Sequence, residues 1–270
     1  MLHPAATHTA ATSVAATASC GELIVVAFRD MNASSRVEAL RESALAGNYT
    51  LIDQPWEPRR GILQRIITLR KLVEEHAQRC GGRSVLLHTD AYDAFFARHS
   101  SDLLQAFRSS GVGALVAAEA DFAWQPTEDK SHWDTLGANR TYRYLNSGGL
   151  IGYPSALIPL LQSAERVCGS SGHLFKMCQK WQTKGADQTA LGHALRLSGH
   201  HASLDYENRV FLVPRVGWRT TPEVAAAGVL RHARFAGSCV VHVPWLTVPK
   251  RRRVFQLVYS QVRNATMGTR

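Results

Sequence analysis

The sequence lacks the features that assign many proteins to a class at once. No part of the 270 residues approaches the roughly 18 to 20 uninterrupted apolar positions of a membrane-spanning helix, because the strongest apolar runs, Leu23–Phe28 and Val85–Leu87, soon stop. A P-loop and a Gly-x-Gly-x-x-Gly fingerprint are both missing, and so is a Gly-x-Ser-x-Gly nucleophile elbow. The sequence therefore predicts no membrane span, and it argues against an ordinary ATPase, a dinucleotide-dependent oxidoreductase or a hydrolase with that elbow.

Cysteine is scarce and irregularly spaced. The five cysteines form no Cys-x-x-Cys pair and have no zinc-type spacing with histidine, which argues against a structural zinc site. Their odd number leaves at least one thiol unpaired within the chain, although Cys168 and Cys178 could close a loop in an oxidising compartment. Asn-x-Ser/Thr sequons, one of them at Asn139, are compatible with secretion but also arise by chance. Neither feature fixes the compartment.

Acidic residues are absent from the end of the chain. The formal net charge is +10, and Pro249–Arg270 contributes six basic residues and no acid to it. The remaining chain is only mildly basic, and its aromatic residues do not alternate with a basic stripe as a nucleic-acid stacking platform requires. Nucleic-acid binding through a basic tail is therefore an alternative and not the leading interpretation.

Composition divides the chain into three predicted segments. Residues 1–20 are predicted to be a disordered leader, because 13 of the first 19 residues are Ala, Thr or Ser and none is charged. A degraded or truncated targeting segment is the alternative. Residues 21–248 are predicted to form a single domain, and residues 249–270 a solvated basic tail.

Apolar strand patterns alternate with helical patterns in the first half of that domain. Runs at 23–28, 84–89 and 113–118 predict buried strands, and helical periodicity over 36–46 and 62–76 lies between the first two. This order predicts an α/β fold with a mostly parallel central sheet flanked by helices, and a ligand site at the carboxyl ends of its strands. Further elements are expected at 49–52, 102–108, 144–153, 155–167 and 188–197, with short strands near Val210 and Val240.

Two carboxylates stand three residues apart directly after a predicted buried strand, in the segment His88–Asp93. As the strand ends, a turn can bring Asp90 and Asp93 to the same side. They would then offer hard oxygen ligands to Mg²⁺ or Mn²⁺, which can in turn hold a diphosphate. The alternative is that Asp90 caps the following turn and Asp93 is solvated.

Three other segments have a plain structural interpretation and a functional one. The two glycines of Leu145–Gly149 let the backbone approach a ligand closely, but a hairpin turn explains them equally well. Asp187 opens a predicted helix and is by default its N-cap. His242 ends an apolar run, where a half-buried core histidine is the simpler interpretation.

Taken in order, these motifs resemble the N-terminal glycosyltransferase domain of the multifunctional procollagen-lysine hydroxylases, a family with a relative in the procollagen galactosyltransferases. The likeness runs from about Leu23 to about Val258. The segments that match are Asn48–Thr50, Gln64-Arg65, Thr89–Asp93, Glu119 with Trp124, Tyr144–Tyr153, Asp187-Gln188, Leu204–Tyr206 with Val210-Phe211, and Val241-His242.

The resemblance implies a GT-A type nucleotide-sugar transferase fold. It also implies a metal-dependent enzyme that transfers a hexose, glucose or galactose, from a UDP-sugar to a hydroxyl acceptor on a protein or glycan, such as hydroxylysine of a collagen-like protein. Mn²⁺ or Mg²⁺ would be held by Asp90, Asp93 and His242, and Asp187 and Trp124 match acceptor-side positions needed for transfer. The endoplasmic reticulum or Golgi lumen would be the compartment.

The resemblance also implies a set of donor-binding residues. Tyr92 would stack on the uracil ring, and Asp90 or a neighbour would contact the ribose. Arg65 stands where the family has lysine, and its planar guanidinium reaches phosphate differently from a compact ammonium group. The full donor set is Ala27, Phe28, Arg65, Asp90, Tyr92, Asn146, Ser147, Gly148 and Gly149.

Two further departures from the family pattern keep a second interpretation open. Val243-Pro-Trp245 follows His242 where the family has Gly-Asn-Gly, and the acidic tract of the family is reduced to Asp187. A relative that binds a UDP-sugar without catalysing transfer is the alternative that these departures favour.

Overall fold

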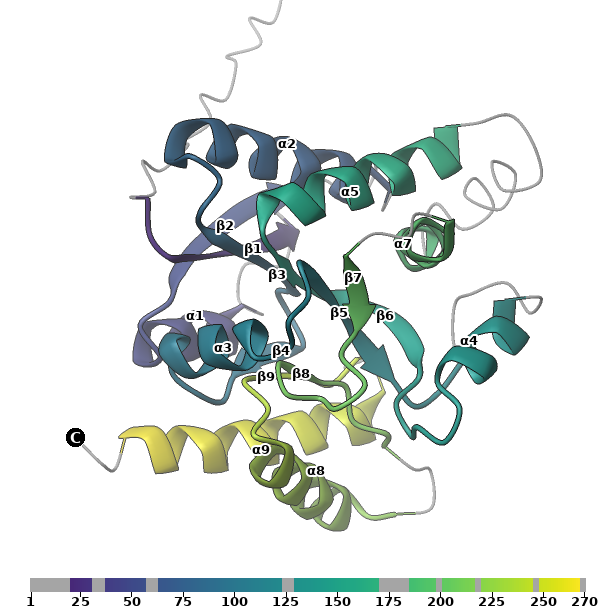
Figure 1. Ribbon diagram of the computed structural model, residues 1–270. Helices are drawn as coiled ribbons and strands as arrows, with labels where there is room; N and C mark the ends of the chain where they lie inside the picture. Colours follow the sequence, from purple (N-terminus) through teal and green to yellow (C-terminus); the bar gives the residue numbers. More distant parts are fainter. Residues whose placement is uncertain are drawn as a thin grey trace, which may run out of the picture.

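A computed structural model gives the fold of this chain and describes residues 20–30, 37–56, 63–122, 129–169, 185–197, 201–216, 220–244 and 248–267. Its centre is a six-stranded sheet in the order β2-β1-β3-β6-β5-β7 (Figure 1). In chain order these strands are β1 (Leu23–Asp30), β2 (Thr50–Trp56), β3 (Val85–Asp90), β5 (Ala114–Glu119), β6 (Tyr144–Gly152) and β7 (Ala202–Leu204).

The sheet is mostly parallel, which confirms the fold class predicted from the sequence. Strands β1, β2 and β3 pair in parallel, as do β5 and β7, whereas β6 runs antiparallel to both of its neighbours. The carboxyl ends of β3, β5 and β7 and the start of β6 therefore lie at one edge. In open α/β sheets this edge is where ligands bind.

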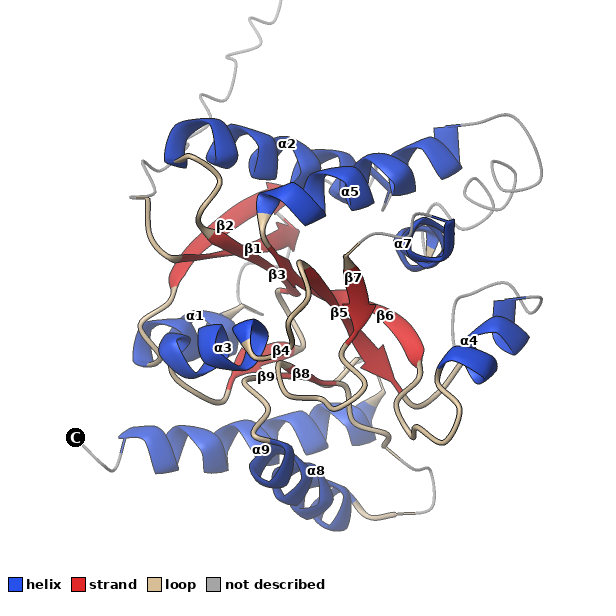
Figure 2. Cartoon of the chain, in the orientation of Figure 1, coloured by secondary structure: helices blue, strands red, loops and turns tan. Residues whose placement is uncertain are grey.

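Helices cover both faces of the sheet because successive residues of a strand point to opposite sides (Figure 2). Val26 and Phe28 of β1 belong to a core cluster with α2 (Leu63–Cys80), α5 (Pro154–Gly169) and α7 (Ala186–Leu197). Val25 and Ala27 belong to a second cluster, with α1 (Glu38–Ala46) and α3 (Ser100–Arg108). The helices expected at 36–46, 62–76, 102–108, 155–167 and 188–197 are thus confirmed, within a few residues at their ends.

A second, three-stranded sheet adjoins the first and has the order β4-β9-β8. It consists of β4 (Ala94–Phe96), β8 (Phe211–Leu212) and β9 (Val240–His242), and β4 pairs with β9 so that Ala94 lies opposite His242. The short strands expected near Val210 and Val240 are present, but β4, β7, α4 (Lys130–Leu136) and α8 (Pro222–Ala236) were not predicted. No helix in the described part of the chain is both long and apolar enough to cross a membrane.

The prediction of a solvated basic tail is wrong. Residues Pro249–Met267 form helix α9, which lies along the second sheet beside α8 (Figure 1). Val254, Phe255 and Val258 are buried, and the Phe255 ring lies 5.4 Å from that of Phe95. Apolar residues at helical spacing make this helix amphipathic, which a count of charges does not detect. The domain therefore continues through α9, and the free tail on which the nucleic-acid alternative depended is a packed helix.

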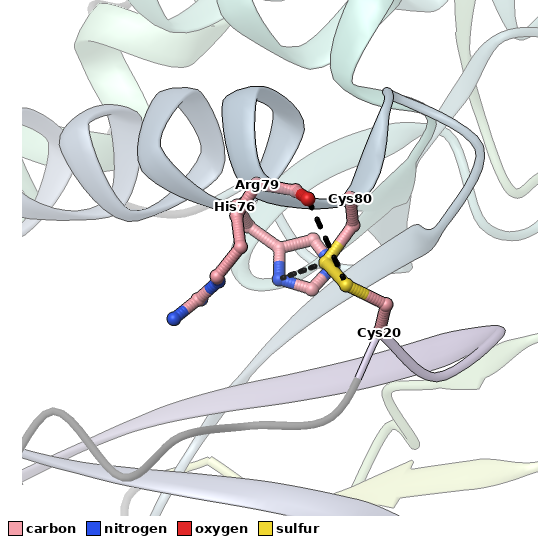
Figure 3. The surroundings of a disulfide bond; sticks show 4 residues. All are labelled: Cys20, His76, Arg79 and Cys80. Carbon is pink, nitrogen blue, oxygen red and sulfur yellow. Dashed lines mark hydrogen bonds between the residues drawn. A yellow bond between two sulfur atoms is a disulfide. The ribbon is translucent and has the colours of Figure 1, made fainter.

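One disulfide links two segments that the sequence analysis did not pair. Cys20, just before β1, is bonded to Cys80 at the end of α2, with their Cα atoms 5.4 Å apart (Figure 3). Cys239 is a buried free thiol, as the odd number of cysteines required. Cys168 is also disulfide-bonded, but Cys178, its predicted partner, lies outside the described residues.

Candidate functional site

Three candidate metal ligands come together from two sheets. Asp90 is the last residue of β3, Asp93 lies in the turn before β4, and His242 is the last residue of β9. The Nε2 atom of His242 is 3.5 Å from Asp90 Oδ2 and 3.2 Å from Asp93 Oδ1. One ligand atom from each residue lies within 4.8 Å of the other two. The structure thus favours the grouping over a solvated Asp93 and an ordinary core histidine.

The surroundings of these three residues fit a divalent cation. His242 is 3% exposed, and neither of its ring nitrogens has a partner with hydrogen-bond geometry among the described residues. Buried polar atoms normally have such partners; this imidazole instead faces the carboxylates of Asp90 and Asp93, and an ion held between the three would satisfy it. Two carboxylates and one imidazole form a donor set that suits Mn²⁺, and the carboxylates also suit Mg²⁺.

Gly148 of β6 forms one wall of the space between the three ligands. A Cβ atom at this position would lie 2.3 Å from His242 Cε1, 2.7 Å from His242 Nδ1 and 2.8 Å from Asp90 Oδ2. The absence of a side chain therefore keeps the space open, as the close backbone approach predicted for Leu145–Gly149 requires. Gly149 differs, because a Cβ there would meet Phe211 and Ala117 of the core.

We expect Gly148→Ala to lose metal binding while the chain still folds. The added methyl group would displace the His242 ring or the Asp90 carboxylate, and these groups belong to two different sheets. Mn²⁺ binding measured by electron paramagnetic resonance should fall by at least about tenfold, the change that corresponds to about 1.4 kcal/mol. Gly228→Ala is the matched control, because a Cβ at Gly228 meets nothing within 4 Å. Full Mn²⁺ affinity in Gly148→Ala would contradict the placement of the ion.

Opposite charges set the protonation of the ligands. Burial disfavours the imidazolium, but the carboxylates of Asp93 and Asp90 outweigh burial and raise the pKa of His242 to about 9. Burial alone would raise the pKa of Asp90, yet Arg65 and His242 hold it well below its ordinary value. Asp90 is therefore ionised, and a metal ion would take the place of the His242 proton.

Arg65 and His88 orient the Asp90 carboxylate from behind. Arg65 of α2 donates to Asp90 Oδ1, which leaves Oδ2 to face His242. A second contact of Arg65 is with His88 Nε2 at 3.4 Å, and His88 Nδ1 lies 3.1 Å from the carbonyl oxygen of Val26. Burial and the charge of Arg65 lower the pKa of His88 to about 4, so the ring is neutral, with its proton on Nδ1 toward Val26. Such second contacts hold metal ligands in place.

A cavity of about 10 Å³, room for little more than one water molecule, lies next to Arg65 and His88 and is lined by several of the predicted donor and acceptor residues. Phe28, Arg65, Ser147 and Asp187 all line it. The guanidinium carbon of Arg65 lies 5.6 Å from the centre of the Phe28 ring. Burial raises the pKa of Asp187, and its carboxylate accepts hydrogen bonds from Ser147 and from the backbone N–H of Gln188. Asp187 is the second residue of α7, so it does not occupy the N-cap position predicted for it, and its carboxylate also lines this cavity.

Gln188 connects helix α7 to the last residue of β5 and to the middle of β6. Its side-chain oxygen accepts from the backbone N–H of Ser147 at 3.3 Å, and its amide nitrogen donates to Glu119 Oε1 at 3.0 Å. Asn146 Oδ1 in turn accepts from the backbone N–H of Gly148 at 2.9 Å. The sequence analysis singled out Glu119 and Gln188 only through the family resemblance. In the structure their side chains are hydrogen-bonded to each other.

The folding stability of the chain is expected to depend on pH through Glu119. Burial raises its pKa from 4.5 to about 7, despite hydrogen bonds from Gln188 and Asn146. A raised pKa means that the folded state keeps a proton that the unfolded state loses, so stability falls as pH rises from about 4.5 to about 7. Glu119→Gln should therefore stabilise the metal-free chain by up to about 3 kcal/mol at pH 8 and by little at pH 5. Urea unfolding in EDTA measures this, and an equal effect at both pH values would contradict it.

The structure says less about the remaining predicted site residues. Tyr92 is half-buried and packs partly against the core, and Ala27 is buried, so only its backbone could meet a ligand. Trp124 lies outside the described residues. The sequence analysis did not select His88, whose only signal was its position two residues before Asp90 near the end of a strand.

Comparisons with known proteins agree with the motifs. The PLOD GT domain family model matches residues 29–179, which include Asp90 and Asp93. The chain is 28% identical over 143 residues to procollagen-lysine,2-oxoglutarate 5-dioxygenase 1 of Pongo abelii, covering 50% of this chain and 19% of that protein. It is 31% identical over 94 residues to the human multifunctional procollagen lysine hydroxylase and glycosyltransferase LH3, covering 35% of this chain and 12% of that protein. These matches confirm the resemblance. The chain spans less than a fifth of the length of each of these relatives.

Among solved structures, the chain is similar to a glycosyltransferase involved in the glycosylation of the major capsid of PBCV-1. The TM-score is 0.48 at 11% identity, and the match covers 85% of this chain and 98% of the other.

Proposed function

Because the chain belongs to the PLOD GT domain family, whose members are glycosyltransferase domains, we propose that it transfers a hexose from a UDP-sugar to a hydroxyl acceptor with the help of Mn²⁺ or Mg²⁺. The observation that carries this proposal is the meeting of Asp90, Asp93 and His242 beside Gly148. Glucose and galactose are the proposed sugars, and hydroxylysine of a collagen-like protein or a glycan hydroxyl is the proposed acceptor.

The residues around the ligands have complementary tasks in this proposal. Asp90 Oδ2, Asp93 and His242 Nε2 would hold the ion, which acts as a Lewis acid on the diphosphate when it is bound. Arg65 keeps Asp90 ionised and adds a permanent positive charge next to the cavity. Positive charge fixed where negative charge develops favours departure of a diphosphate. Tyr92 would contact the uracil ring through its apolar face.

The acceptor side is assigned to Asp187 and Trp124. Asp187 is buried near Arg65 and accepts hydrogen bonds from Ser147 and the backbone N–H of Gln188, so the orientation of its carboxylate is fixed by its neighbours. A carboxylate in this place would accept a hydrogen bond from the acceptor hydroxyl and take up its proton as the new bond forms. The Trp124 assignment rests on the family resemblance alone.

Hydrolysis of a UDP-sugar in the absence of any acceptor tests this function. We expect release of UDP from UDP-glucose or UDP-galactose when Mn²⁺ is present, and none when EDTA removes it. No metal-stimulated release from either donor, under conditions where the chain is folded, would favour the non-catalytic alternative.

Asp187→Ala separates transfer from binding. If Asp187 acts on the acceptor side, turnover should fall by about 10² to 10⁴, as for a lost acid–base group, while UDP and Mn²⁺ affinities stay nearly unchanged. If Asp187 only stabilises the first turn of α7, the same change would cost about 1 kcal/mol of stability and leave turnover per folded molecule alone. Calorimetry with UDP and Mn²⁺ gives the affinities, and UDP release gives turnover. Asp102→Ala, an exposed residue in the first turn of α3, is the matched control.

A further inference from the structure

A second pocket lies at the carboxyl edge of the large sheet, built from residues that take no part in the metal centre. Its volume is about 410 Å³, within the range of about 300 to 1,000 Å³ that is typical of small-molecule sites. Residues 139–142 precede β6 and residues 206–209 follow β7, so both loops leave the sheet at the edge where Asp90 ends β3. Helix α8 closes the pocket with His232 and Ala236.

The walls of this pocket are aromatic. Tyr142, Tyr206 and His232 are each half-buried. The rings of Tyr142 and His232 lie 5.2 Å apart between centres, at an angle of 57°. Tyrosine combines a flat apolar ring with a polar hydroxyl, so it suits ligands that have both apolar faces and hydrogen-bonding groups.

Asn208 supplies a buried polar atom that needs a partner. Its side chain is 1% exposed, its amide nitrogen lies 3.3 Å from His232 Nε2, and its carbonyl oxygen has no partner among the described residues. The backbone of Asn208 is left-handed, with φ at 52°, and the Ser238 hydroxyl donates to the backbone carbonyl oxygen of Asn208. Asn208 is therefore fixed in place with one side-chain acceptor left over.

The loop around Asn208 is preorganised. Buried Asp205 accepts hydrogen bonds from the backbone N–H groups of Arg209, Val210 and Phe211 at 3.1, 2.8 and 2.8 Å. A ligand that entered the pocket would thus not have to order this loop, which lowers the entropic cost of binding.

The rim is polar and its charge is partly compensated. Arg140 forms an ion pair with Glu207, and its guanidinium carbon lies 5.9 Å from the centre of the Tyr206 ring. Arg209, Asn139 and Thr141 are exposed beside them. These planar and hydroxyl groups can donate to and accept from neighbouring hydroxyls of one ligand.

We propose that this pocket binds a saccharide. A sugar ring offers apolar C–H faces to tyrosine rings and hydroxyls that both donate and accept. Exposed Thr141 and Arg209 on the rim can hydrogen-bond to these hydroxyls, and the charge of Arg140 is already compensated by Glu207, which disfavours a phosphate. The proposal does not depend on the metal centre or on transfer, and its test uses neither.

Titration of the full chain with simple sugars, followed by amide resonances, tests the proposal. The chain is produced in bacteria so that the sequon at Asn139 stays unmodified, and EDTA is present so that the metal centre is empty. The probes are the methyl glycosides of glucose, galactose and N-acetylglucosamine, and inorganic phosphate serves as the anionic alternative. We expect at least one glycoside to shift resonances of residues 139–142 and 206–209, and phosphate to leave them in place.

Variants of Tyr206 identify the contact. Tyr206→Ala should weaken glycoside binding by about tenfold, which is the upper end for loss of one aromatic contact, whereas Tyr206→Phe should retain most of it. Arg234→Ala, an exposed residue of α8 outside the pocket, should bind as the wild type does. If Tyr206→Ala fails to fold, the amide resonance shifts of the wild-type chain test the proposal by themselves.

Three results would overturn the proposal. The first is no shift with any of the three glycosides at about 50 mM, a concentration far above a dissociation constant of about 1 mM. The second is a phosphate response at these residues that exceeds the glycoside response. The third is glycoside binding that a folded Tyr206→Ala retains in full.

Discussion

Asp93→Asn is expected to abolish Mn²⁺-dependent UDP binding while the chain remains folded. The substitution preserves size and shape but removes the charge that a hard divalent cation requires from its ligands. Asp93 Oδ1 lies 3.2 Å from His242 Nε2, so the loss falls directly on the space between the three ligands. We expect UDP affinity at saturating Mn²⁺ to fall by at least about 100-fold, which corresponds to about 2.7 kcal/mol.

Calorimetry with UDP and Mn²⁺ measures this change against two further variants. Asp102→Asn, an exposed change on α3, should bind UDP as the wild type does. His242→Ala should also weaken binding, because it removes the third ligand. Wild-type affinity in Asp93→Asn would remove the whole Asp-x-x-Asp segment from the site, whereas wild-type affinity in His242→Ala alone would remove only the histidine.

Val258→Asp on helix α9 should have the largest effect on stability. Val258 is fully buried between α9 and the core beneath β4 and β9, together with Val254 and Phe255. The substitution would remove the apolar packing of the valine, and the new carboxylate would be buried with no hydrogen-bond or ion-pair partner provided for it. We expect the free energy of unfolding to fall by about 4 kcal/mol, which is a large part of the roughly 5 to 15 kcal/mol that stabilises a typical domain.

Gln261→Asp is the matched control for this prediction, because Gln261 is exposed on the same helix. It introduces the same charge and should change stability by no more than about 0.5 kcal/mol. Urea unfolding followed by circular dichroism compares the two. Equal stabilities for Val258→Asp and Gln261→Asp would mean that α9 is a solvated appendage after all.

The parts of the fold that follow from local pattern were predictable. Leu23–Phe28 is apolar and rich in β-branched residues, and Val85–Leu87 is a short apolar run, so both are recognisable as buried strands. The turn after the second strand brings Asp90 and Asp93 together. Helix α9 was missed because the sequence analysis counted its charges and not the helical spacing of its apolar residues, such as Val254, Val258 and Val262. Strand β4 was missed because three residues carry too little pattern.

The parts of the site that depend on distant contacts were not predictable from pattern. His242 reaches Asp93 only because β4 pairs with β9 across a long stretch of sequence, and the family resemblance was the sole signal for it. The same holds for Gly148, whose need for an open Cβ position appears only once β6 lies beside His242. The Cys20–Cys80 bond joins two segments that no spacing rule pairs.

Crystals of the chain grown with Mn²⁺ and UDP, measured at a wavelength where manganese scatters anomalously, test the central claim most directly. The account predicts one strong anomalous peak in the space bounded by Asp90, Asp93, His242 and Gly148, with the UDP diphosphate on the same ion. A Mn²⁺ peak elsewhere on the chain, or bound UDP with no metal at these three residues, would contradict it.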